Sequence, residues 1–361
     1  MNAARPVLIM AGGTGGHVFP ALAAAECLRE RGVPVIWLGV RTGLEATLVP
    51  KAGIPMEWIE VAGLRGKGLR RRLQTPFMLA RALWQARVVL RRLQPVVVLG
   101  MGGFVSGPGG VMARLLGIPL VVHEQNAIAG LTNRILARLA NRVLEAFPGT
   151  FPPQRQALTV GNPVRQAIAD LPLPAERFAG REGRMRLLVL GGSQGALALN
   201  QLVPQALALL SDAKRPEVWH QAGGRLQDAA QAAYAQAGMT VRLTPFINDM
   251  AEAYGWADVV LCRAGALTIA ELAAAGVGAV LVPFPFAVDD HQTANARFLE
   301  QGGAALLIQQ ADLSAERLAD LLRELGSDRA RLVQMAEAAR RLAKIEAADQ
   351  VATVCLEQAR F

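Results

Sequence analysis

The chain has 361 residues, of which 52% are hydrophobic, enough to bury the cores of two domains. Its formal net charge of +9 points to an anionic partner: nucleic acid, a phosphorylated substrate or an anionic membrane surface. The three cysteines, Cys27, Cys262 and Cys355, are odd in number and far apart, which argues against a disulfide framework or a zinc motif and fits a reducing cytosol.

Short apolar runs alternate with helical stretches along the first half, as expected for strands of a parallel sheet. These runs are residues 7–10, 35–38, 96–99 and 120–122. A proline-spaced passage over residues 160–174 predicts a connection between domains. The alternation then returns at residues 187–190, 218–220, 259–262 and 279–282, and after about residue 313 only helical patterning remains. We therefore predict an α/β fold of two Rossmann-like, doubly wound domains, with their loops facing one interdomain cleft.

Two glycine loops follow predicted strands, over residues 12–17 and 191–195. Such loops bring backbone N–H groups and a helix N-terminus to one spot, which suits a phosphate. The first loop lacks the dinucleotide fingerprint, because Val18 stands where the last glycine belongs, and the second fails the same test. Residues 63–68 also fail as a Walker A motif, since Val61 replaces the first glycine and Gly68 the Ser or Thr. NAD and P-loop chemistry are thus disfavoured, and a plain strand-to-helix turn stays open for either loop.

Three polar segments of the second half each follow a predicted strand, at residues 245–250, 262–271 and 289–296. Their amides, hydroxyls and carboxylate are suited to reading a base, a ribose and a sugar. Glu271 is the ribose candidate, because a carboxylate accepts hydrogen bonds from two adjacent hydroxyls. The alternatives are a helix-dipole charge for Glu271 and a solvent-facing helix cap for Gln292.

Taken together, several motifs resemble those of the MurG family over nearly the whole chain. They are residues 12–17, 100–110, 123–126, 161–165, 191–195 and 289–296. The resemblance implies the GT-B fold and a reaction that moves N-acetylglucosamine (GlcNAc) from UDP-GlcNAc to the 4-hydroxyl of the muramyl sugar of lipid I. The product would be lipid II, with inversion to a β-1,4 linkage, for peptidoglycan synthesis.

The resemblance also implies roles for individual residues. Donor-sugar contacts would come from Thr14, Gly15, Gly16 and Asn126, and diphosphate contacts from Ser193 and Arg165. The backbone of Ile247 would meet uracil, and Gln292 would reach the GlcNAc hydroxyls. His17 would be the base that takes the acceptor proton, although a structural histidine in a turn is the alternative. The nucleotide would be surrounded by Ala266, Leu267, Thr268, Ile269, Ala270 and Glu271.

Neither a metal nor a cofactor is expected. Many sugar-nucleotide enzymes hold a metal with Asp-x-Asp, whereas Asp289 and Asp290 are adjacent here. The domains expected are residues 1–162 for the acceptor and membrane side, residues 163–340 for UDP-GlcNAc, and residues 341–361 as a helix packing back on the first domain.

Residues 69–84 have the features that an enzyme needs in order to reach a lipid acceptor without spanning the membrane. Leu73, Phe77, Ala80 and Trp84 recur at helical spacing beside arginines, which predicts a face for an anionic membrane surface. An ordinary amphipathic helix packed on its sheet is the alternative. The expected location is peripheral, on the cytoplasmic face of the inner membrane, with cell-wall synthesis proteins as possible partners.

Three rival functions stay open. Another GT-B glycolipid glycosyltransferase or a UDP-GlcNAc epimerase would share the nucleotide site, but the motifs at Phe104 and His123 argue against both. A nucleic-acid-binding protein would explain the charge, yet two tyrosines and no interleaving of basic and aromatic residues make it the weakest of the three.

Overall fold

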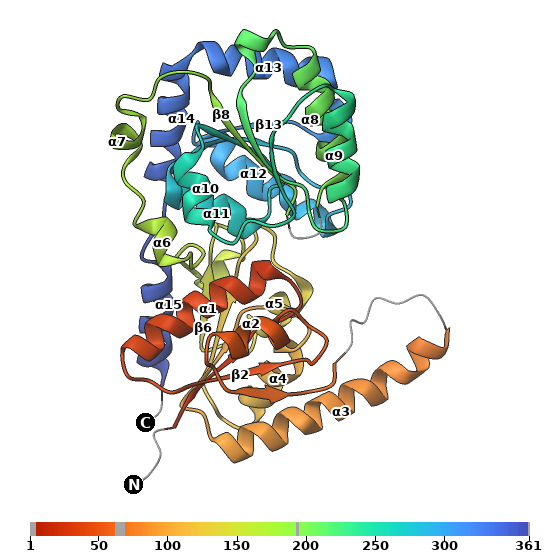
Figure 1. Ribbon diagram of the computed structural model, residues 1–361. Helices are drawn as coiled ribbons and strands as arrows, with labels where there is room; N and C mark the ends of the chain where they lie inside the picture. Colours follow the sequence, from red (N-terminus) through yellow and green to blue (C-terminus); the bar gives the residue numbers. More distant parts are fainter. Residues whose placement is uncertain (1–4, 62–68, 193–194, 360–361) are drawn as a thin grey trace. The chain divides into compact units, whose positions relative to one another are not determined.

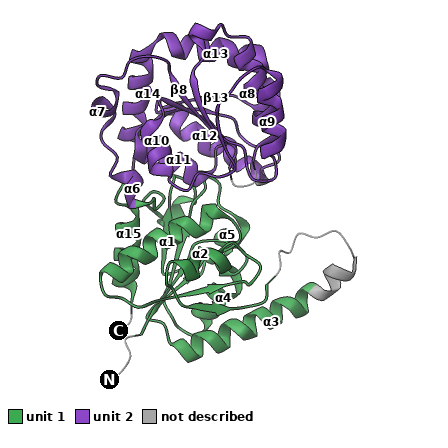
Figure 2. Cartoon of the chain, viewed as in Figure 1, with its two compact units in different colours: residues 1–165, 344–361 green, residues 166–343 purple. Residues whose placement is uncertain are grey.

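The computed structural model describes residues 5–61, 69–192 and 195–359, without the side chains of residues 69–74 and 288. It contains two compact units, one made of residues 1–165 and 344–361 and the other of residues 166–343 (Figure 2). The sequence-based bounds fell at residues 162 and 340. The first unit is therefore interrupted in the chain by the second.

Unit 1 is built on a seven-stranded parallel sheet with the order β3-β2-β1-β4-β5-β6-β7. Its strands are β1 (Val7–Met10), β2 (Val35–Gly39), β3 (Met56–Trp58), β4 (Val97–Gly100), β5 (Leu120–Glu124), β6 (Arg142–Glu145) and β7 (Leu158–Thr159). Both faces of the sheet are covered, because alternate residues of each central strand are apolar and buried on opposite sides.

The helices of unit 1 divide between the two faces (Figure 1). One face carries α1 (Gly15–Glu30), α2 (Glu45–Lys51) and α15 (Ala347–Gln358), whose buried side chains join Val7 and Ile9 in one core. The other carries α3 (Leu69–Leu93), α4 (Ser106–Leu115) and α5 (Leu131–Leu136), which pack with Leu8 and Met10 in a second core.

Unit 2 repeats the plan with a six-stranded parallel sheet in the order β10-β9-β8-β11-β12-β13. The strands are β8 (Arg186–Leu190), β9 (Glu217–Gln221), β10 (Arg242–Thr244), β11 (Val259–Cys262), β12 (Gly278–Leu281) and β13 (Ala305–Leu307). The helices are α6 (Gln166–Ala169), α7 (Pro174–Phe178), α8 (Leu197–Ala208), α9 (Gln227–Gln236), α10 (Met250–Trp256), α11 (Ala266–Ala275), α12 (His291–Gln301), α13 (Ala315–Ser327) and α14 (Arg329–Arg341). One core joins strand side chains to buried residues of α8, α13 and α14.

Each sheet reverses its winding direction once, between β1 and β4 in unit 1 and between β8 and β11 in unit 2. In doubly wound folds, ligands bind beyond the carboxyl ends of the strands at such switch points. The loops that follow these four strands are therefore where a site is expected.

Candidate functional site

At the switch point of unit 1, Ser106 ties the loops after β1 and β4 together. Its buried hydroxyl lies 2.9 Å from the carbonyl oxygen of Met10 and 2.7 Å from that of Gly102. The Met101 N–H donates to the same Met10 carbonyl at 2.8 Å. These contacts hold the two loops side by side at the edge of the sheet.

A buried carboxylate, Glu45 at the start of α2, organises the first glycine loop. Its Oε2 accepts from the Gly13 N–H at 3.0 Å and its Oε1 from the Val40 N–H at 3.2 Å. A Cβ added at Gly12 or Gly43 would lie 2.5 Å and 2.1 Å, respectively, from a carboxylate oxygen of Glu45. These glycines thus make room for Glu45, and the Gly13 N–H is not available to a phosphate. No local sequence pattern marks Glu45, because it is 32 residues beyond Gly13 in the chain.

His17 stands in the first turn of α1, which begins at Gly15 and Gly16 and has Thr14 as its N-cap. The Thr14 hydroxyl lies 3.3 Å from Nδ1 of His17. When that hydroxyl accepts the Nδ1 proton, Nε2 is the ring nitrogen that carries the lone pair. The opposite side of the ring faces Gly102, where an added Cβ would lie 2.9 Å from Nε2. Gly102 therefore leaves space around the nitrogen that a base would use.

Glu124, at the end of β5, shapes the loop that carries Asn126. One carboxylate oxygen accepts from the backbone N–H and the side-chain amide of Asn126, at 2.9 and 3.1 Å. The other accepts from the Gly130 N–H at 3.1 Å and the Asn133 amide at 2.9 Å. Glu124 thus satisfies four donors while buried, so it positions Asn126 and the start of α5.

His123 and Gln125 tie β5 to the segment that leaves unit 1. Nε2 of His123 lies 2.8 Å from the Gly161 carbonyl, and the Gln125 amide donates to Nδ1 at 3.0 Å. Burial lowers the pKa of His123 to about 4, so the ring is neutral at pH 7 and Nε2 is its donor. The Asn162 amide donates to the Gln125 carbonyl at 2.9 Å. Three residues on, the Arg165 guanidinium lies over the ring of Phe19, with its carbon 5.6 Å from the centroid.

At the switch point of unit 2, the second glycine loop leads from β8 into α8. Gly192 and Gly195 both have a φ of +78°, a conformation that favours glycine. An added Cβ at Gly195 would lie 2.2 Å from the Ala222 carbonyl oxygen, so only glycine fits. Ser193 lies outside the described residues. Helix α8 begins with no side-chain cap and no acidic residue in its first turn, which favours an anion there.

Helix α11 starts at Ala266, directly after the loop that follows β11. It likewise has no side-chain cap and no acidic residue in its first turn, where Leu267 and Thr268 lie. In the second turn, Glu271 is buried with only 5% of its surface exposed, and its Oε2 accepts from the Tyr254 hydroxyl at 3.1 Å. Ile269 is buried, whereas Ala270 is partly exposed. The helix thus offers backbone donors at its start and one carboxylate in its middle.

Gln292, in the first turn of α12, and Ile247, in the loop between β10 and α10, contribute further polar groups from unit 2. The side-chain oxygen of Gln292 accepts from the N–H groups of Ala264 and Phe284, at 3.2 and 2.9 Å. Its NH2 group has no partner within the described part of the chain, so it is the end that can reach a ligand. Ile247 buries its side chain in the loop between β10 and α10. Gln292 is therefore more than a solvent-facing cap, because it holds two loops together.

The candidate residues divide between the units. Unit 1 carries Thr14, Gly15, Gly16, His17, Asn126 and Arg165, and unit 2 carries Ile247, Gln292 and residues 266–271. Over residues 5–61, 69–192 and 195–359, no cluster of three or more His, Cys, Asp or Glu side chains could hold a metal ion. Chemically, unit 2 offers two helix N-termini without acidic residues and one buried carboxylate, and unit 1 offers a histidine beside a glycine-lined space.

Comparison with known proteins finds two family models along the chain. The glycosyltransferase family 28 N-terminal domain matches residues 7–145, and the corresponding C-terminal domain matches residues 186–351. The fold and the two sites thus define a glycosyltransferase of the GT-B class.

Full-length relatives narrow the class. The chain is 61% identical to proteins of Nitrosococcus oceani and Alkalilimnicola ehrlichii, covering 98% of this chain in both and 98% and 99% of theirs. Both are named UDP-N-acetylglucosamine--N-acetylmuramyl-(pentapeptide) pyrophosphoryl-undecaprenol N-acetylglucosamine transferase. The crystal structure of Acinetobacter baumannii MurG matches with a TM-score of 0.85 and 44% identity over 98% of this chain and 99% of that one. This chain belongs to the MurG family.

Proposed function

We propose that this protein transfers GlcNAc from UDP-GlcNAc to the 4-hydroxyl of the muramyl sugar of lipid I, forming lipid II with a β-1,4 linkage. The observation that carries the proposal is full-length identity of 61% to transferases named for this reaction. The two switch-point sites fit it, because one suits a nucleoside diphosphate and the other carries a histidine in place to accept a proton.

Unit 2 would bind the donor. The backbone N–H groups at the start of α8 and α11 would stabilise the diphosphate, whose negative charge grows as UDP departs. The Ile247 backbone would meet uracil, Glu271 the ribose hydroxyls and the Gln292 NH2 group the sugar hydroxyls. The carboxylate of Glu271 already accepts from Tyr254, so the ribose would share it with a tyrosine hydroxyl.

Unit 1 would bind the acceptor and take its proton. Attack at the anomeric carbon requires the 4-hydroxyl to lose its proton as the new bond forms, and Nε2 of His17 would accept it. Thr14 would hold the ring by its other nitrogen, 3.3 Å away. Asn126, Gly15 and Gly16 would contact the donor sugar, and Arg165 would add a charge-assisted contact to the diphosphate, together with Ser193.

Helix α3 would rest on the anionic surface of the cytoplasmic face of the inner membrane. Phe77 and Trp84 are 75% and 64% exposed, and Ala80 is exposed beside them, so this stripe does not pack on the sheet. The opposite face, with Ala86, Val89 and Leu90, does. None of the described helices has the length and hydropathy needed to cross a membrane. Leu73 has no described side chain.

The direct test is transfer of radiolabel from UDP-GlcNAc into the lipid fraction with lipid I as acceptor, with a chelator added to a parallel reaction. Label that appears with and without chelator supports the proposal and a reaction that needs no metal. Binding of UDP-GlcNAc with no transfer to lipid I would support the proposed donor site but contradict lipid I as the acceptor.

A further inference from the structure

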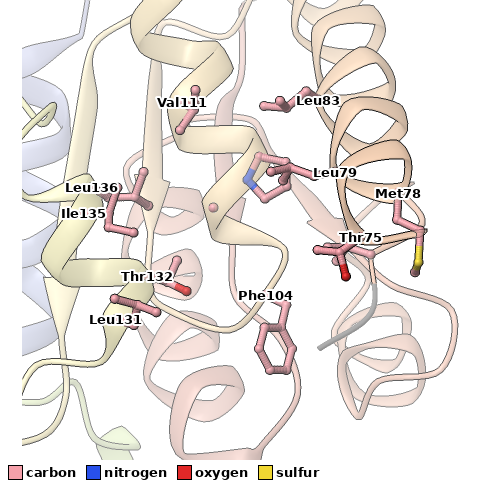
Figure 3. A pocket seen from close by; sticks show the side chains of 13 residues that line it. Thr75, Met78, Leu79, Leu83, Phe104, Val111, Leu131, Thr132, Ile135 and Leu136 are labelled. Carbon is pink, nitrogen blue, oxygen red and sulfur yellow. The ribbon is translucent and has the colours of Figure 1, made fainter. Parts of the chain in front are cut away.

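An apolar cavity of about 320 Å³ lies in unit 1 between three helices, α3, α4 and α5 (Figure 3). Side chains from all three point toward the same space, and the ring of Phe104 lies between the two sides. The large apolar residues that line the cavity include Leu79, Leu83, Phe104, Val111, Leu131 and Ile135.

The cavity exists because α3 is packed along only part of its inner face. Its second half buries Ala86 and Leu90 against the sheet, whereas its first half offers Leu79 to the cavity. Phe104 and Ile135, which also line the cavity, are 52% and 45% exposed. Large apolar side chains gathered around an open cavity mark a binding site for an apolar group.

The lining determines what kind of molecule can enter. Apart from the hydroxyls of Thr75 and Thr132, the side chains that line the cavity are apolar. An extended peptide would leave its N–H and C=O groups without hydrogen-bonding partners there. One turn of an α-helix, about 10 Å across and 5.4 Å long, fills roughly 400 Å³ and does not fit. A flexible hydrocarbon chain fits both the chemistry and the size.

The same segment that lines the cavity also borders the candidate base. Gly102 leaves the space beside the His17 ring, and Phe104, only two residues on, enters the cavity. Two steps along the backbone span at most about 8 Å. In a lipid-linked acceptor, one sugar ring and a diphosphate separate the reacting hydroxyl from the hydrocarbon. The cavity is therefore close to His17 without including it. Such an acceptor requires this separation, because its reacting hydroxyl and its hydrocarbon occupy different places.

We propose that this cavity binds the isoprene units of the acceptor lipid nearest to its diphosphate. The inference rests on the proposed function and names the part of the acceptor that unit 1 recognises. An apolar cavity of about 150 Å³ binds benzene, which has six carbons, so a cavity of about 320 Å³ holds roughly ten carbons or slightly more, about two isoprene units. The rest of the chain stays outside.

A series of acceptors that differ only in prenyl length tests this, assayed without vesicles and below any micelle concentration. Each carbon that leaves water for the cavity tightens binding about fourfold. We expect the acceptor KM to fall steeply up to about ten carbons and then to level off. A KM that keeps falling through fifteen and twenty carbons would overturn the proposal, because partition into a lipid phase has no such limit.

Two matched variants test whether the dependence of the acceptor KM on prenyl length arises in the cavity. Ile135→Asn puts an amide in the cavity wall, whereas Leu115→Asn makes the same kind of change on α4 at a residue that is 72% exposed and does not line the cavity. Ile135→Asn should raise the KM of the ten-carbon acceptor at least tenfold and leave the Kd of UDP-GlcNAc unchanged. Leu115→Asn should change neither. Equal effects of the two variants would overturn the proposal.

Calorimetry with a ten-carbon prenyl diphosphate separates this inference from the proposed function, because it needs no turnover. Binding that Ile135→Asn weakens and Leu115→Asn preserves supports the cavity as a prenyl site, even if wild-type protein transfers sugar to no acceptor. No binding of the prenyl diphosphate, together with weaker vesicle binding by Ile135→Asn, would assign the cavity to bilayer acyl chains and overturn the proposal.

Discussion

Gly43→Ala tests whether the buried carboxylate of Glu45 holds the first glycine loop. The new Cβ would lie 2.1 Å from Oε2, so the carboxylate must move. Moving it breaks its hydrogen bonds to the N–H groups of Gly13 and Val40. Gly224→Ala is the matched control in unit 2, because no atom lies within 4 Å of its added Cβ and neither glycine has a positive φ.

The magnitude follows from these contacts. Two hydrogen bonds to a charged group together stabilise the folded state by roughly 3–6 kcal/mol. Alanine also reduces the conformational entropy of the unfolded chain, which offsets about 0.4–1 kcal/mol of the loss. We therefore expect Gly43→Ala to destabilise unit 1 by about 2–5 kcal/mol. Gly224→Ala should leave unit 2 unchanged or stabilise it by up to about 1 kcal/mol.

Hydrogen exchange read by mass spectrometry measures the two units separately. In Gly43→Ala, the slowest amides of β1 and β4 should exchange about 30-fold faster or more, since 2 kcal/mol corresponds to that factor. Peptides from β8 and β11 should not change. Equal protection of β1 in Gly43→Ala and wild type would refute the structural role given to Glu45.

Three further predictions concern the base, pH and the membrane. His17→Ala should lower kcat steeply and preserve the Kd of UDP-GlcNAc, and unchanged turnover would remove His17 from the mechanism. Burial lowers the pKa of both His123 and His220 to about 4. Their stabilisation is therefore full above pH 6.5 and is lost as the pH falls toward 4, costing about 2 kcal/mol per histidine at pH 5. Urea midpoints at pH 7 and 5 measure this loss, and an unchanged pH dependence in His220→Gln would contradict it. Phe77→Ser with Trp84→Ser should weaken sedimentation with anionic vesicles without changing transfer to a soluble acceptor; undiminished sedimentation would exclude this stripe from the membrane contact.

The sequence predicted the strands that are apolar throughout and missed several others. Residues 7–10 and 259–262 were placed with the bounds that β1 and β11 have. The short edge strands β3 and β10 were missed because each has three residues, all of them partly or fully exposed, so no apolar run marks it. Strand β13 was also missed, although it lies in an apolar run over residues 304–308. Strand β6 was missed although it is mostly buried, since Arg142 and Glu145 flank only two apolar residues.

Within the candidate site, the sequence predicted the loops that contain glycine, but it did not predict the contacts between residues that are far apart in the chain. The loops at Gly12 and Gly191 could be found because a strand, glycines and a helix follow in order. Glu45 and Gln292 act on backbone groups of distant loops, and no local pattern marks such contacts. The one available signal for Glu45 was Gly43 two residues before it.

The interruption of unit 1 by unit 2 bears on how the protein is made. Helix α15 buries Val351, Ala352 and Cys355 against α1 and the sheet of unit 1, although it follows the whole of unit 2 in the chain. A ribosome delivers the chain from its N-terminus, and domains generally fold as they emerge. Unit 2 can therefore finish folding first, whereas the core beneath α1 is complete only after the residues of α15 have been synthesised. During that interval the unfinished half exposes the apolar surface that α15 will cover, so chaperones have a defined window in which to act.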